Sequence, residues 1–444
     1  MTDGQERYRA AVAAAAKWDD EQIAANVWAL AFEPKTREDE WSMSVGLESL
    51  GRKVHPHVLA ILRDHSLHER LTETTERRVV LADETPLSQL CGVIGKDPPA
   101  EIVALLAPFF DSSNEGARCA AARTVAACGS DESVPFVRKG LADFLSDGPR
   151  LAKVGLSTLH GIRRAIKAGR ISDLFRRSVF EAIAQLIARD IAGLEICELL
   201  LELDRDRAVE AILDERCFVI ENPYLHKLLK AVNKQGILVP RERLLWLIAK
   251  LRAVELKYPS TYLMAAALLA LGRHHVPEDR ECLEEMAGHM DETVAEGATD
   301  GLIACDGLEH FRKKMDDALS SGGYDALNSR QQHYFGVQWL DIEVNNGGIH
   351  QYFSNSTGET WKMALEGFDV MGMADRASAL REMINLFGPE GPSIDRERRN
   401  AQLDEINPDY EWWTDAFNET YYACAGNVMV AAKRYVLAHP ESFR

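Results

Sequence analysis

Apolar residues recur along most of the chain at intervals of three and four positions, which is the spacing of one face of an α-helix. The pattern is clearest over residues 102–110, 175–186 and 244–251. Sustained alternation of apolar and polar residues, typical of half-buried strands, is absent, and apolar runs such as 217–220 are isolated. The pattern therefore predicts an all-α fold.

The predicted helices come in pairs. A helix over 100–110 is followed, after a polar turn, by an alanine-rich helix over 115–128. The same succession returns over 265–305, where Gly297-Ala298 corresponds to Gly116-Ala117. Small residues on the second helix of a pair let neighbouring pairs stack closely, as a solenoid requires.

In this succession the chain resembles the HEAT-repeat family, whose units are about 40 residues of two antiparallel helices. The resemblance is best over 98–190 and 258–306, and it implies an α-solenoid; an irregular helical domain is the alternative. We divide the chain into an N-terminal helical region of the solenoid (1–97), HEAT-like repeats (98–319), a Ser-Ser-Gly-Gly linker (320–323) and a compact acidic helical domain (324–444).

Charge separates the C-terminal segment from the rest. The chain has 51 Lys+Arg and 69 Asp+Glu, a formal charge of −18. Residues 320–444 contain 10 Lys+Arg and 18 Asp+Glu, a formal charge of 10 − 18 = −8 over 125 residues. Their net negative charge per residue is about twice that of the first 319 residues. Phosphate contact needs a basic surface, so the overall charge argues against a general nucleic-acid binder.

Cysteine usage and hydropathy indicate the compartment. The eight cysteines form no Cys-x-x-Cys pair, and most lie in helical patterns, where a free thiol is a small buried hydrophobe. The longest apolar runs, 10–16 and 263–271, are too short to span a bilayer. With no signal-peptide pattern at the N-terminus, we expect a cytoplasmic protein with reduced thiols and no membrane association.

Signatures of common catalytic sites are not found in the sequence: it has no phosphate-binding Gly-x-x-x-x-Gly-Lys, no nucleophile elbow and no His-Glu-x-x-His. His55, His57, His65 and His68 are close in sequence but lack a ligand pattern of known spacing. We therefore expect no metal site, no cofactor and no enzymatic activity.

The most distinctive segment is Asn-Gly-Gly-Ile-His-Gln-Tyr-Phe-Ser-Asn-Ser over 346–356, with a glutamate upstream. The two glycines follow a predicted helix and are expected to cap its C-terminus, and the turn after them to cap the next helix. One interpretation is a structural helix–helix corner. The other is a polar binding cluster. We do not expect such a cluster to be catalytic, because amides are neither nucleophiles nor proton carriers. The candidate residues of this motif are Glu343, Asn346, Gly347, Gly348, Gln351, Tyr352 and Asn355.

This motif, the pair Tyr421-Tyr422 and the ending over 439–443 resemble the bacterial DNA-mimic-type domain family, otherwise classed as a domain of unknown function. The resemblance covers residues 324–444, and Ile349 replaces a bulkier apolar residue expected after the glycines. It implies an acidic all-α domain. One branch of the family binds a helix-turn-helix transcription regulator in place of DNA, and related domains resemble immunity proteins against toxins.

Residues 404–419 contain six carboxylates and no Lys or Arg, a set we call the acidic ridge: Asp404, Glu405, Asp409, Glu411, Asp415 and Glu419. A helix over 410–422 would place the last three on one face, about 6 Å apart along the axis. That spacing is close to the spacing of phosphates along a strand, so the basic face of a DNA-binding protein could accept it. On the opposite face, Trp413, Phe417 and Tyr421 would anchor the helix. A solvated face that promotes solubility is the alternative.

A segment of opposite charge lies in the predicted repeats. Residues 148–180 contain eight cations and one acid, 8 − 1 = +7. This basic stripe could bind nucleic acid, an acidic protein or the C-terminal domain, and a solvated basic face is the simplest interpretation. Its members are Arg150, Lys153, Arg163, Arg164, Lys167, Arg170, Arg176 and Arg177.

These observations predict a non-enzymatic interaction protein whose acidic ridge binds a basic protein, such as a DNA-binding protein or a toxin, through electrostatic complementarity. Direct binding of nucleic acid is not expected. One alternative is a HEAT-like nucleic-acid-binding protein or DNA glycosylase that uses the basic stripe. Another is an immunity protein that neutralises a toxin. The oligomeric state does not follow from the sequence.

Overall fold

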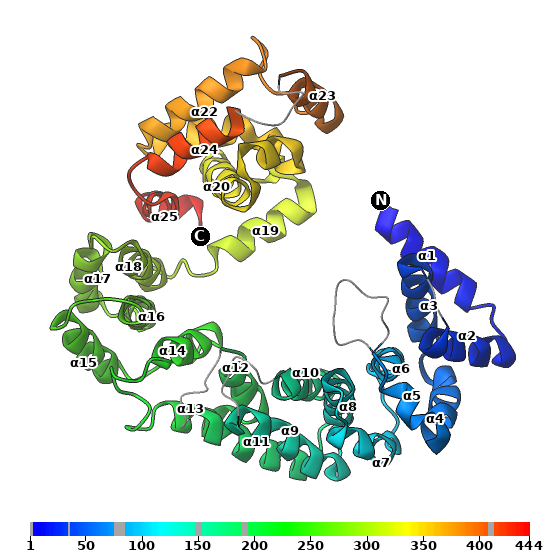
Figure 1. Cartoon of the computed structure of the whole chain (residues 1–444). Coiled ribbons are helices and arrows are strands. Elements are labelled where there is room, and N and C mark those ends of the chain that lie inside the picture. The colour runs from blue at the N-terminus through cyan, green and yellow to red at the C-terminus, as the bar shows by residue number, and fades with distance from the viewer. Residues whose placement is uncertain (1–2, 34–35, 75–84, 147–152, 188–193, 407–412) are drawn as a thin grey trace. The chain divides into compact units, whose positions relative to one another are not determined.

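The structure is a computed structural model that describes residues 3–33, 36–74, 85–146, 153–187, 194–406 and 413–444 (Figure 1). Within these ranges every regular element is a helix, 25 of them α-helices, and there is no strand. The predicted all-α fold is confirmed. No described helix is both long and apolar enough to cross a membrane. The chain divides into two compact units, residues 1–231 and 232–444.

Unit 1 consists of short helices joined by turns and 3-10 segments. Its helices are α1 (Asp3–Ala15), α2 (Asp20–Phe32), α3 (Arg37–Ser49), α4 (His55–Arg63), α5 (His68–Leu71), α6 (Pro86–Ile94), α7 (Ile102–Leu106), α8 (Glu115–Cys128), α9 (Val134–Ser146), α10 (Lys153–Lys167), α11 (Asp173–Ile187), α12 (Leu194–Leu203) and α13 (Arg205–Ile212). The next helix, α14 (Leu225–Lys234), includes the boundary between the units.

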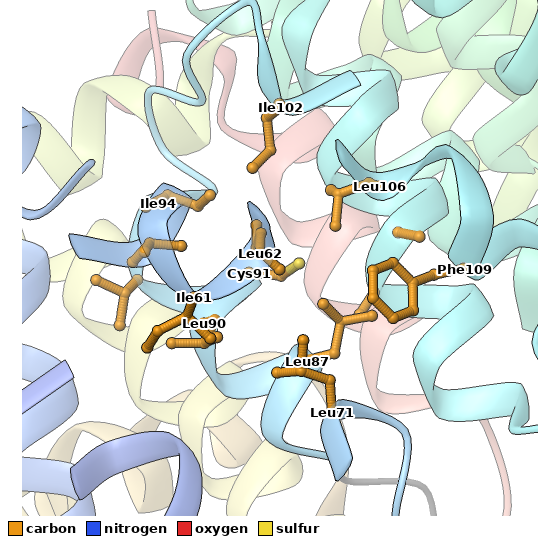
Figure 2. Packing of buried hydrophobic residues seen from close by; sticks show 14 of the residues in the cluster. Ile61, Leu62, Leu71, Leu87, Leu90, Cys91, Ile94, Ile102, Leu106 and Phe109 are labelled. Atoms are coloured by element: carbon orange, nitrogen blue, oxygen red, sulfur yellow. The ribbon is translucent and has the colours of Figure 1, made fainter. Parts of the chain in front are cut away.

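The core of the first half of unit 1 lies between α4, α6 and α7. Leu62, Leu90 and Leu106 point into it from these three helices and are almost completely buried (Figure 2). Burying each such side chain contributes roughly 1.5–3 kcal/mol. Cys91 lies among them, and burial raises the pKa of its thiol to about 11. All eight cysteines are free, which agrees with the predicted reduced thiols.

Glycine allows α8 and α10 to pack closely. Lys153 meets Glu115 where both helices begin, and Gly161 lies against Arg123 further along, so the two helices run parallel. A Cβ atom on Gly161 would lie 2.2 Å from the Arg123 carbonyl oxygen, closer than any side chain tolerates. The predicted role of small residues in stacking neighbouring helices is thus confirmed here.

Unit 2 begins with a second set of stacked helices: α15 (Arg241–Arg252), α16 (Ser260–Gly272), α17 (Arg280–Ala287) and α18 (Glu292–Cys305). Helices α16 and α18 repeat the parallel glycine contact of α8 and α10. A Cβ atom on Gly272 would lie 1.9 Å from the Gly301 carbonyl oxygen, and one on Gly297 would lie 2.4 Å from the Ala265 Cα atom.

The rest of unit 2 is α19 (Phe311–Gly322), α20 (Ser329–Ser354), α21 (Trp361–Val370), α22 (Ala374–Leu386), α23 (Arg396–Ile406), α24 (Trp413–Ala423) and α25 (Val428–Ala438). The residues of the predicted linker, Ser320 to Gly323, lie at the end of α19 rather than in an irregular segment. Gly323 ends that helix with a φ of 65°. Helices α20 to α24 enclose an aromatic core around Phe353 and Phe368.

Helix α25 packs on α18, so the C-terminal helices and the stacked helices of unit 2 share an interface. The Lys433 ammonium lies 2.8 Å from a carboxylate oxygen of Glu296 and 2.8 Å from one of Asp300, and its side chain is only 4% exposed. Next to this ion pair, Ile303, Val436 and Phe443 belong to one apolar cluster. The interface therefore combines a buried charge with an ordinary hydrophobic core.

Candidate interaction site in the C-terminal domain

The Asn-Gly-Gly motif lies inside α20, where it forms a kink. As predicted, the two glycines end a helical segment, and a second segment follows them directly and continues to Ser354. Gly347 is extended (φ −161°), whereas Gly348 has a φ of 76°, a conformation that favours glycine. A Cβ atom on Gly348 would also lie 2.5 Å from Nδ2 of Asn418. The backbone therefore favours glycine at 348, and a larger residue there would also displace the Asn418 amide.

The upstream glutamate joins the two sides of this kink. The Glu343 carboxylate, 7% exposed, accepts hydrogen bonds from Gln351 Nε2 (2.6 Å), Asn355 Nδ2 (3.0 Å) and Thr357 Oγ1 (3.0 Å). Two of the amides that we considered for a binding cluster thus bind the protein's own carboxylate. Asn346 is exposed and lies outside this group. The sequence analysis did not identify Thr357.

A buried arginine fixes the turn that follows. Arg399 of α23 is completely buried, and its guanidinium donates to the carbonyl oxygens of Phe353 (2.7 Å) and Asn355 (2.8 Å). These carbonyls lie at the end of α20, where a cation is favourable because the helix dipole is negative there. Burial lowers the pKa of Arg399. Tyr352, also buried, shares a hydrogen bond of 3.2 Å with the Thr360 hydroxyl.

Three hydrogen bonds attach α24 to the kinked helix. The Tyr421 hydroxyl donates to the Asp341 carboxylate (2.9 Å), and the Tyr422 hydroxyl donates to the Val344 carbonyl oxygen (2.8 Å). The third comes from the Ile349 N–H, which donates to Asn418 Oδ1 (3.2 Å). Burial raises the pKa of Asp341. The polar groups of the motif therefore hold a corner and a neighbouring helix in place, which is the structural interpretation of the two that we considered.

Comparison with known proteins supports the resemblance. Residues 325–439 match the family model described as DMP19-like protein. The match covers 439 − 324 = 115 of the 444 residues and contains α20 to α25. We refer to this part as the DMP19-like domain. The comparison with curated proteins gave no match, and the comparison with solved structures gave none either.

The acidic ridge falls on two helices of the DMP19-like domain. Asp404 and Glu405 are exposed at the end of α23, and Glu419 is exposed on α24. Asp415 lies on α24 as well, although its side chain is outside the described part, as are Asp409 and Glu411.

Of the predicted helix over 410–422, the described part is α24, Trp413–Ala423, which carries Asp415 and Glu419 of the ridge. Residues 410–412, with Glu411, lie outside the described residues. On the opposite face of α24, Phe417 and Tyr421 are buried and their rings stack 5.6 Å apart, as their spacing predicted. The side chain of Trp413 is not described.

The basic stripe is dispersed among internal contacts of unit 1. Lys153 pairs with Glu115 (2.7 Å), and Arg163 pairs with Glu198 (3.2 Å). In addition, Arg170 pairs with Asp97 (2.9 Å), and Arg176 donates to the Leu203 carbonyl oxygen (3.1 Å). Arg164, Lys167 and Arg177 are exposed, and Arg150 lies outside the described residues. Among the described members of the stripe, four cations are therefore engaged in contacts within unit 1.

Proposed function

We propose that this protein is a non-enzymatic interaction protein whose DMP19-like domain binds a basic, DNA-binding protein in place of DNA. The observation that carries the proposal is the match of residues 325–439 to the DMP19-like family. The charge of the matched residues agrees with it, since they contain 9 Lys+Arg and 17 Asp+Glu, 9 − 17 = −8. A surface of this sign attracts a basic partner and raises its association rate.

The geometry of α24 supports the same role. A surface that replaces DNA must hold its carboxylates at fixed positions, because ordering them at the moment of binding would lower the affinity. Asn418, Tyr421 and Tyr422 tie α24 to α20, while Glu419 remains exposed on the outer face. The partner contact that we propose comprises Asp404 and Glu405 on α23 together with Glu419 on α24.

The remaining helices add a second surface. We propose that the stacked helix pairs within each unit are HEAT-like repeats, and that they bind a further protein partner. Their parallel helices and close glycine contacts support this assignment. A bacterial, cytoplasmic setting fits both a DNA-binding partner and the free thiols.

The test is affinity capture with the full chain, in which the bound proteins are identified by mass spectrometry. We expect the chain to retain DNA-binding proteins at low salt and to lose them at moderate salt. Competing duplex DNA should release them, because the partner would use one basic face for both. The triple variant D404N/E405Q/E419Q should retain less than a tenth of the partner, since three surface charges of the contact are removed.

The control variant E366Q/E382Q/E390Q removes three exposed carboxylates elsewhere in the same domain. It should retain the partner within about twofold of the wild type, because it leaves the three carboxylates of the proposed contact unchanged. Equal loss in both variants would show that total charge, not the ridge, matters. Unchanged capture by the D404N/E405Q/E419Q variant would contradict the proposed surface.

A further inference from the structure

Tyr422 presents an aromatic ring to solvent next to a carboxylate of the acidic ridge. It lies on α24 and is 55% exposed, whereas Tyr421 beside it is 2% exposed. Glu419, three residues earlier on the same helix, is also exposed. Residues three apart in a helix are neighbours, with Cβ atoms about 5–6 Å from one another. The ring of Tyr422 and the carboxylate of Glu419 therefore form one exposed pair.

The protein itself holds the ring of Tyr422 in place. The Tyr422 hydroxyl donates to the Val344 carbonyl oxygen (2.8 Å), and its ring makes an edge-to-face contact with that of Tyr421, with centroids 5.9 Å apart. Because the backbone of α20 engages the hydroxyl, the part of Tyr422 that a partner can contact is its aromatic ring. A ring that is ordered before binding costs less conformational entropy in the complex than a mobile one.

The domain already contains one arginine that binds a tyrosine of this helix. Arg376 of α22 is 7% exposed, and its Cζ atom lies 5.2 Å from the centroid of the Tyr421 ring. The Tyr421 hydroxyl donates to the Asp341 carboxylate (2.9 Å), so a tyrosine, a carboxylate and an arginine occur together on the buried face of α24. On the outer face, Tyr422 and Glu419 present the first two of these groups to solvent.

An arginine side chain fits this exposed pair better than a lysine side chain does. A guanidinium is planar, stacks on an aromatic face and is more weakly hydrated than an ammonium. While it lies on the ring, its N–H groups can donate to a carboxylate one helical turn away. A lysine ammonium is a compact, strongly hydrated charge, which gains from the carboxylate but less from the ring.

We propose that Tyr422 and Glu419 bind an arginine side chain of the basic partner. This inference rests on the proposed function, because it specifies how the DMP19-like domain recognises that partner. Arginine is common on DNA-binding faces, where it pairs with phosphates and with guanine. A basic face that binds DNA therefore presents the side chain that this pair accepts. Asp404 and Glu405 attract the partner by charge, whereas Tyr422 selects arginine.

The experiment follows the tyrosines of the full chain by fluorine NMR. The 11 tyrosines are replaced by fluorotyrosine, and the Tyr422 signal is assigned as the one that Y422F lacks. The probes are tetra-arginine amide and tetra-lysine amide, which carry the same charge. We expect tetra-arginine to shift the Tyr422 signal at a concentration at least about threefold lower than tetra-lysine does.

Two other exposed tyrosines serve as internal controls. Tyr8 and Tyr258 are 52% and 72% exposed, and their signals should not distinguish the two peptides. The variant E419Q should weaken the response of Tyr422 to tetra-arginine about threefold, because it removes one charge of a surface contact. The matched variant E382Q, which removes an exposed carboxylate of α22, should change that response by less than about 1.5-fold.

Affinity capture with the same chain connects the site to the partner. There Y422L should retain about threefold less partner than the matched variant Y8L. Equal retention by these two variants, equal responses of Tyr422 to the two peptides, or an unchanged response in E419Q would each overturn the inference. The proposed function fails separately, if the wild-type chain captures no DNA-binding protein although Tyr422 responds selectively to tetra-arginine.

Discussion

The backbone N–H of Ile349 donates a hydrogen bond to the side-chain oxygen of Asn418, 3.2 Å away. This bond connects the kink of α20 to α24, the helix that carries Glu419. The N–H is available because the kink at Gly347 and Gly348 removes it from the regular helical pattern. The conformation of two glycines thus helps to determine the position of a helix 69 residues further along the chain.

Replacing Gly348 by alanine should therefore disturb α24. The variant G348A combines a φ of 76° with a Cβ atom 2.5 Å from Asn418 Nδ2. We expect the free energy of unfolding to fall by about 2–4 kcal/mol, and amide exchange in α24 to accelerate. Gly372 provides the control, since it has a φ of 74° but open space around a Cβ atom. G372A should lower the free energy of unfolding only through its backbone conformation, by about 1 kcal/mol. Equal losses in the two variants would rule out the contact with Asn418.

Removing the Glu343 carboxylate should loosen the corner. In E343A, the donors on Gln351, Asn355 and Thr357 lose their shared acceptor, and an unsatisfied buried donor costs about 1–3 kcal/mol. We expect a loss of about 3 kcal/mol or more, measured as a lower midpoint of thermal unfolding. E343Q keeps one acceptor oxygen and should lose about half as much. A loss in E343A no larger than in E343Q would contradict the role of the carboxylate as a shared acceptor.

Lys433 should be needed for the packing of α25 on α18. In K433M the apolar part of the side chain remains, but Glu296 and Asp300 lose their cation. These carboxylates are about 40% and 36% exposed and can be rehydrated, so we expect a loss of about 2 kcal/mol rather than the larger cost of a fully buried charge.

Limited proteolysis of the K433M variant should show faster cleavage between α18 and α25. The control R330Q breaks an exposed ion pair with Glu441 and should change the unfolding free energy by less than about 1 kcal/mol. Cleavage of K433M at the wild-type rate would show that apolar contacts alone hold this interface.

Asp341 should make stability depend on pH. Burial raises its folded-state pKa above the ordinary value of 3.8, so the folded protein binds this proton more tightly than the unfolded chain. The contribution of this proton to the free energy of unfolding is fully present below pH 3.8, and it is lost as the pH rises through the raised pKa of Asp341. D341N should remove this part of the pH dependence, measured as urea midpoints between about pH 4 and 7.

The variant Y421F tests the same site from the other side. The Tyr421 hydroxyl donates to the Asp341 carboxylate and lowers its pKa, so removing the hydroxyl should move the loss of stability to higher pH. A pH profile identical to that of the wild type in both variants would exclude Asp341 as its origin.

Helical periodicity was sufficient to predict the all-α fold and the buried face of α24. Both follow from the spacing of apolar residues, which shows the side of a helix that packs on its neighbours. It also predicted the close stacking of helices rich in small residues, as at Gly297. The motif around Glu343 was found from the sequence, but its role was not. Whether a side-chain amide binds a ligand or a nearby carboxylate depends on distances in the folded structure, and the spacing of residues along the sequence does not determine them.

Buried charges were the main features that the sequence analysis missed. Arg399 follows Arg396 and Arg398 in a charged segment typical of a solvated helix, and nothing local marks it as buried. Lys433 could have been recognised from the sequence, because it lies in the apolar helix α25 among small residues. A cation in that position indicates that the element packed against the helix carries a carboxylate.

The ion pair of Lys433 also restricts how such a protein can evolve by recombination. A gene fusion that moved the DMP19-like domain onto an unrelated chain would carry Lys433 and the apolar Val436 to the surface without their acceptors and neighbours. The stacked helices left behind would expose Ile303 and two carboxylates. Helices α18 and α25 are therefore expected to be inherited together, as a single genetic segment.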